Sequence, residues 1–149
     1  MKKSFRAQIA DDATDRIRLS TNNGLTGYKI VKFQGTTKEP FESDAEHVMK
    51  IFSLEPDAAN NTINFSDPTL LATLQFTDSS SNSVSYSESI TIFDNMVINQ
   101  DIYVTHVDAR GSNPANYYIE LEQVKLNANE ATVATLKDMR AGPDTNFGP

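Results

Sequence analysis

The segment Tyr117-Tyr118-Ile119-Glu120-Leu121-Glu122-Gln123-Val124-Lys125-Leu126 decides the fold of this 149-residue chain. In its middle, Ile119 and Leu121 alternate with Glu120 and Glu122, which is the period of two expected of a β-strand with one buried and one solvated face. No other strand pattern in the chain is as long. Both carboxylates are therefore expected to face solvent.

Shorter patterns of the same kind recur along the chain at intervals of about 10 to 15 residues, separated by clusters of Gly, Pro, Asn, Asp and Ser. About eight strands with no convincing central helix predict an all-β protein built as a single antiparallel β-sandwich. The jelly-roll order is preferred because short turns alternate with long crossing loops, and an immunoglobulin-like Greek-key sandwich is the alternative. The expected strands are 16–21, 28–33, 47–52, 63–65 (a short edge strand), 70–76, 86–93 resuming at 97–98, 102–107 and 117–126.

Two segments have patterns that admit two interpretations. In Tyr28–Phe33, Tyr28 and Ile30 share one face while Val31 and Phe33 share the other, which indicates a two-sided strand or a β-bulge near its middle. In Ala131–Arg140 the apolar spacing fits a helix, whereas its Thr-Val and Thr-Leu pairs favour a strand.

The two ends of the chain differ from its middle. We expect an N-terminal arm at 1–14, the β-sandwich at 15–140 and a C-terminal tail at 141–149. Each end has few large apolar residues and nearby charges, so these segments either fray or become ordered against a partner. In the second case the partner contacts are predicted to be Phe5, Arg6, Ile9 and Phe147.

Composition excludes several classes of protein. The absence of Cys excludes disulfide scaffolds, thiolate zinc sites, iron–sulfur clusters and cysteine nucleophiles. A net charge of −7 argues against binding to duplex nucleic acid, which needs a basic face. No apolar run approaches the roughly 20 residues needed to span a bilayer, and no membrane partner is expected.

Catalytic and metal-binding patterns are also missing from the sequence. His47 and His106 lack metal-ligand spacing, and each is expected to be a satisfied or surface residue rather than part of a shared site. Glu120 and Glu122 are spaced like a glycosidase pair, but alternation places both in water, where their pKa values would not be split. The serine-rich segment around Ser79–Ser81 has no G-x-S-x-G elbow. We therefore expect no enzyme activity, no cofactor and no metal, although loop carboxylates such as Asp57 leave calcium as an alternative.

A group of segments is distinctive when taken together: Ile17–Thr21, Glu46–Ile51, Ile63–Ala72, Ile92–Asn95, Asn99–His106, Asn116–Glu122 and Asn129–Arg140. As a group they resemble small virion structural proteins of marine tailed bacteriophages, over roughly residues 15–140. The resemblance implies a non-enzymatic particle component and supplies no binding residues of its own.

The expected function is that of a capsid decoration (cement) protein bound to the major capsid protein shell as a homo-oligomer in the virion. Assembly in the host bacterial cytoplasm is consistent with the absence of Cys, since disulfides do not persist there. The alternatives are a neck or tail component, and a host-surface carbohydrate-binding module that uses the loops at Asp78–Ser85 and Asp108–Asn113.

Overall fold

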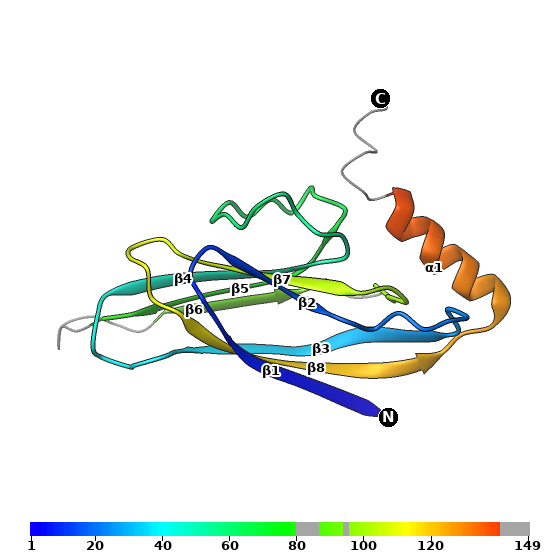
Figure 1. The fold of residues 1–149 in the computed structure, drawn as a ribbon, viewed down its shortest axis with the longest axis horizontal. Coiled ribbons are helices and arrows are strands. Elements are labelled where there is room, and N and C mark those ends of the chain that lie inside the picture. The colour runs from blue at the N-terminus through cyan, green and yellow to red at the C-terminus, as the bar shows by residue number, and fades with distance from the viewer. Residues whose placement is uncertain (80–86, 94–95, 141–149) are drawn as a thin grey trace.

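A computed structural model describes residues 1–79, 87–93 and 96–140 of the chain, the last four of these by their backbone alone. The predicted tail at 141–149 with Phe147, and most of the predicted hairpin tip at Asp78–Ser85, lie outside the described residues. The described part contains eight strands and one helix (Figure 1): β1 Lys2–Ile9, β2 Ala13–Ile17, β3 Thr26–Thr37, β4 Ala45–Phe52, β5 Leu70–Asp78, β6 Glu88–Ile92, β7 Ile102–Asp108, β8 Ala115–Lys125 and α1 Ala128–Arg140.

The strands form two antiparallel sheets packed face to face, so the predicted all-β sandwich is confirmed. One sheet has the order β1-β8-β3 and the other the order β2-β7-β4-β5-β6. The pairs β1–β8, β2–β7 and β4–β5 are those made when one long hairpin is rolled up, which is the jelly-roll order. The expected order therefore describes seven of the strands.

Strand β6 is the exception to that order. It pairs with β5 at the edge of the five-stranded sheet rather than with β3. The position beside β3 is filled at one point by Ile98, whose backbone N–H and C=O both pair with Tyr28, at 2.9 and 2.8 Å.

The predicted N-terminal arm is wrong, because Lys2–Ile9 is a full strand of the sandwich. Each residue of β1 is in register with β8, from Lys2 opposite Glu122 to Ile9 opposite Ala115. Phe5 packs against the core and Ile9 is fully buried. The sandwich therefore begins at residue 2, not residue 15.

Three other predicted elements need correction or refinement. Residues 63–65 belong to the connection between β4 and β5 and are not a strand. Strand β2 covers residues 13–17 instead of 16–21. The ambiguous segment 131–140 is helical, and its start is fixed by Asn127 and Glu130, each of which accepts a hydrogen bond at 2.9 Å from the other's backbone N–H.

The bulge expected near the middle of 28–33 is confirmed at Val31, where the register of β3 against β8 shifts between Ile30 and Lys32. The extra residue has a structural consequence. Lys29 lies opposite Glu122 and Lys32 lies opposite Glu120, so both lysines lie on the same side of the sheet despite their odd spacing.

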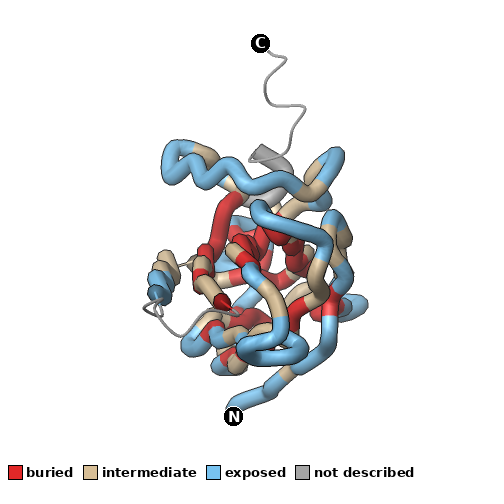
Figure 2. Tube along the Cα trace, turned by 90° about the vertical axis from the view of Figure 1, so that its left-hand side faces the viewer, coloured by how far each residue is buried: buried red, intermediate tan, exposed pale blue. Residues whose placement is uncertain are grey.

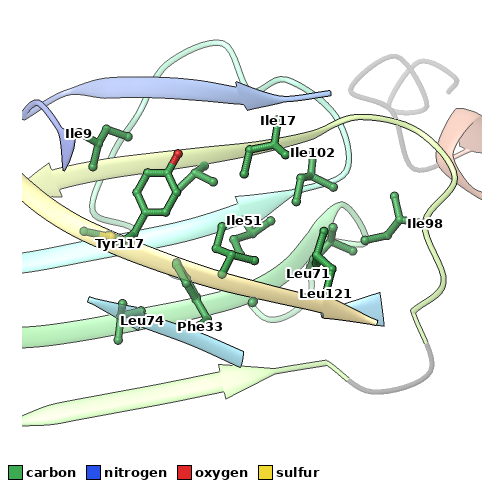
Figure 3. Close-up of a cluster of buried hydrophobic side chains, with 14 of the residues drawn as sticks. Ile9, Ile17, Phe33, Ile51, Leu71, Leu74, Ile98, Ile102, Tyr117 and Leu121 are labelled. Atoms are coloured by element: carbon green, nitrogen blue, oxygen red, sulfur yellow. The ribbon is translucent and has the colours of Figure 1, made fainter. Parts of the chain in front are cut away.

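The core lies between the sheets and receives side chains from both (Figures 2 and 3). Ile9, Phe33, Tyr117 and Leu121 come from the three-stranded sheet and meet residues of the other sheet that include Ile17, Ile51, Leu74 and Ile102. At Gly35 the two sheets are closely packed, since a Cβ there would lie 2.8 Å from side-chain atoms of both Leu74 and Phe76.

Candidate interaction face on the three-stranded sheet

The side of the three-stranded sheet that faces away from the core carries a regular lattice of polar side chains. Register across β1, β8 and β3 places these residues in four rows of three. We call this surface the outer face; its rows are Lys2–Glu122–Lys29, Ser4–Glu120–Lys32, Arg6–Tyr118–Gln34 and Gln8–Asn116–Thr36.

Contacts along and between these rows hold the lattice in place. In the last row, Gln8 Nε2 donates to Asn116 Oδ1 at 3.0 Å, and Asn116 Nδ2 donates to Thr36 Oγ1 at 3.3 Å. Lys2 Nζ lies 3.7 Å from a carboxylate oxygen of Glu120. The outer face thus has fixed amides at one end and alternating charges at the other.

A groove of about 560 Å³ opens on the outer face at its amide end. Tyr118 lies on the central strand of the groove, between Arg6 on β1 and Gln34 on β3. This combination offers one aromatic surface, one cation and amide groups, which suits a polar partner surface with exposed carboxylates. The lining residues are Arg6, Ala7, Gln34, Gly35, Thr36, Asn116, Tyr117 and Tyr118.

Of the contact residues predicted from the sequence, the structure places only Arg6 at this surface. Phe5 and Ile9 point into the core from the other side of β1, because successive side chains of a strand face opposite ways. Phe147 lies outside the described residues. Glu120 and Glu122 are on the outer face, as expected from their alternation, with lysines as cross-strand neighbours.

The two histidines form a buried pair, although neither was expected to share a site with the other. His47 on β4 and His106 on β7 are both fully buried, and His47 Nδ1 lies 2.8 Å from His106 Nε2. Their contact depends on the pairing of β4 with β7, two strands far apart in the sequence. Within the described residues, no three His, Asp or Glu side chains are grouped so that they could hold a metal ion.

In the predicted carbohydrate-binding loop at Asp108–Asn113, the carboxylate of Asp108 is already hydrogen-bonded within the protein. Asp108 accepts hydrogen bonds from the backbone N–H groups of Glu46, Arg110 and Asn113 at 3.0 to 3.1 Å, and from Asn113 Nδ2 at 2.9 Å. Burial raises the pKa of Asp108, but these bonds outweigh it and hold the pKa at about 2. Both oxygens therefore serve the loop's own structure.

No protein-family model and no curated protein matches this chain. Solved structures that resemble this chain include two viral VP1 proteins. One is the VP1 protein of Trichodysplasia spinulosa-associated polyomavirus in complex with 3'-sialyllactose, which is 10% identical, with a TM-score of 0.42, over 82% of this chain and 93% of that one. The other is the unassembled pentamer of Merkel cell polyomavirus VP1, which is 9% identical, with a TM-score of 0.39, over 82% and 94% of the two chains. At identities and scores this low, neither similarity bears on what this chain binds.

No helix among the described residues combines the length and apolar composition that a bilayer span requires.

Proposed function

We propose that this chain is a non-enzymatic structural protein of a bacteriophage virion, and that it decorates the major capsid shell through the outer face of its three-stranded sheet. The observation that carries the proposal is the outer face itself, a polar lattice whose backbone is fixed by a buried core on its other side. The segments that resemble virion proteins of marine tailed phages support the same class. Assembly would take place in the host bacterial cytoplasm.

The charges of the outer face suit a carboxylate-bearing protein surface. Four cations (Lys2, Arg6, Lys29 and Lys32) face outward beside two carboxylates, although the whole chain carries a net charge of −7. A locally basic face on an acidic protein orients its approach to an acidic partner, and it also disfavours contact between outer faces of two copies.

The size of the outer face indicates a weak contact that is used many times. Strands about 4.8 Å apart and same-face residues about 6.8 Å apart make a surface of roughly 400 Å² for three strands and four rows. Stable pairwise interfaces bury roughly 800 Å² on each partner. We therefore propose that copies of this chain also associate with one another on the shell, so that avidity stabilises binding.

A binding assay on shells that lack this protein tests the role of the outer face. Arg6→Glu reverses the charge in the groove, and Lys38→Glu makes the same charge change in the exposed connection between β3 and β4. We expect Arg6→Glu to weaken cosedimentation with shells by about tenfold or more, as loss of a central interface contact does. Lys38→Glu should bind like the wild type. Equal binding by both variants would contradict the proposed contact face.

Phe147 remains a proposed second contact from the C-terminal tail at 141–149. Deletion of 141–149 tests it in the same assay, where a reduced occupancy of shells is expected. Unchanged occupancy would remove the tail from the interface and leave the outer face as the proposed contact.

A further inference from the structure

Lys50 is a buried cation at the centre of the five-stranded sheet. It is only 3% exposed, and it faces away from the core, toward the connection formed by residues 53–69. That connection lies over the sheet on the side opposite the three-stranded sheet (Figure 1). Among the described residues, no ion pair joins Lys50 to a carboxylate.

The lysine amine is held against a side-chain amide of the connection. Lys50 Nζ donates to Asn60 Oδ1 at 2.8 Å and to the backbone carbonyl of Thr62 at 2.5 Å, and it lies 5.5 Å from the centre of the Phe52 ring. Asp67 lines the same small pocket, of about 170 Å³, together with Lys50, Phe52 and Asn60. An amine, an amide, a carboxylate and an aromatic ring therefore line one small pocket.

We propose that Lys50 and Asn60 condense into an intramolecular isopeptide bond. The Lys50 amine attacks Asn60 Cγ, so that the Nζ–Cγ bond forms and the Cγ–Nδ2 bond breaks. The proton that Nζ loses is taken up by Nδ2, which leaves as ammonia. The reaction exchanges one amide for another and needs no oxidant, reductant or activating group.

The surroundings favour each step of this exchange. Burial lowers the pKa of Lys50, with Asp67 offsetting part of that effect, so the neutral, nucleophilic amine is more accessible than in water. The Thr62 N–H donates to Asn60 Oδ1 at 3.0 Å, and this oxygen gains negative charge when the amine adds to Cγ. Asn60 is itself exposed, which gives ammonia a route to solvent. The fixed contact between amine and amide supplies the proximity that such reactions require.

The bond would tie strand β4 covalently to the connection that covers it. The segment 50–60 would become a closed loop, and the connection could no longer separate from the sheet while the rest of the sandwich stayed folded. This inference does not depend on the proposed function, because it concerns only groups within one chain.

Intact-mass measurement of the purified full-length chain tests the inference directly. We expect the measured mass to be lower than the mass calculated from the sequence by one ammonia. After proteolysis, we expect a branched peptide in which Lys50 is joined to Asn60. Lys50→Arg and Asn60→Ala should restore the full mass, and Asn60→Asp should lose one water in place of ammonia. Asn64→Ala is the matched control, because Asn64 lines the same pocket without bonding to Lys50, and it should keep the mass deficit.

Two results would overturn the inference. One is a wild-type chain that has the full sequence mass after prolonged incubation at neutral and mildly basic pH. The other is a deficit that persists in Lys50→Arg, because ammonia would then be lost by cyclisation of an asparagine without the lysine. The wild-type mass and the branched peptide decide the matter even if a variant fails to fold.

Discussion

His47 donates a hydrogen bond to His106 across two paired strands, and the contacts of the two rings indicate the tautomer of each. His106 Nδ1 lies 2.9 Å from the carbonyl oxygen of Ala10, which can only accept, so that nitrogen carries a hydrogen. His106 Nε2 is then the acceptor for His47 Nδ1–H at 2.8 Å. His47 Nε2 is left as a buried acceptor with no partner among the described residues.

The first prediction is that this pair makes the protein less stable in mild acid. Burial, and then the neighbouring His106, lower the pKa of His47 to about 4 from its ordinary value of 6.5. The unfolded chain therefore binds more protons than the folded one between these values, and stability rises with pH in this window. The free energy of unfolding should fall as pH drops from 6.5 toward 4, by up to about 3 kcal/mol.

Urea denaturation at several pH values between 7 and 4 measures this effect. His47→Gln removes the titrating group and should flatten the pH dependence in this range, whatever its effect on stability at pH 7. A wild-type midpoint that stays constant from pH 7 to pH 4 would show that His47 is not held neutral by the fold.

A second prediction concerns Asp101, which holds the segment after β2. Its carboxylate accepts from the backbone N–H groups of Leu19 and Ser20, at 2.8 and 2.9 Å, and from Arg16 Nε at 2.8 Å. Asp101→Ala should lower the free energy of unfolding by about 2 to 4 kcal/mol, because it leaves buried N–H groups without acceptors. Arg16→Ala should cost about 1 kcal/mol or less, since the Arg16 side chain is 50% exposed.

Chemical denaturation of these two variants at pH 7 compares the contribution of the Asp101 carboxylate to the free energy of unfolding with that of the Arg16 cation. Burial raises the pKa of Asp101, but the bonds from Ser20, Arg16 and Leu19 outweigh it and bring the pKa to about 2. The carboxylate is thus ionised throughout the window in which His47 titrates. If both variants lost the same free energy of unfolding, the stabilisation would come from the ion pair and not from the hydrogen bonds with the backbone of Leu19 and Ser20.

A third prediction is that Gly35→Ala destabilises the sandwich. An added Cβ would lie 2.8 Å from Leu74 Cδ2 and from Phe76 Cε1 in the opposite sheet, so these side chains or the backbone that carries them must shift. Overpacking of this kind costs about 1 to 3 kcal/mol. Gln34→Ala, one residue away on the outer face, is the control and should change the thermal midpoint little. A Gly35→Ala variant as stable as the wild type would mean that the sheets have room to separate there.

The fold was easiest to predict from the sequence where apolar and polar residues alternate regularly, or where that alternation is broken within a strand. The solvent-facing glutamates of β8 and the bulge at Val31 follow from local patterns, because side-chain direction along a strand has a period of two. The helix α1 was ambiguous from its apolar spacing, yet Asn127 and Glu130 form a capping box that the sequence already contained.

Features that depend on pairing between distant segments could not be predicted in the same way. The N-terminal strand has few large apolar residues, and only its register with β8 shows that Phe5 and Ile9 point inward while Arg6 points outward. From the sequence, Arg6 is therefore predicted only as part of an arm, and the lattice around it is not predicted. The contact between His47 and His106 likewise requires the pairing of β4 with β7.

The copy number of this chain in purified particles, measured by quantitative mass spectrometry against the major capsid protein, tests the proposed role most directly. A protein that covers a symmetric shell through many weak contacts should be present in hundreds of copies per particle. About a dozen copies or fewer would indicate a neck or tail ring, and absence from the particle would contradict a structural role in the virion altogether.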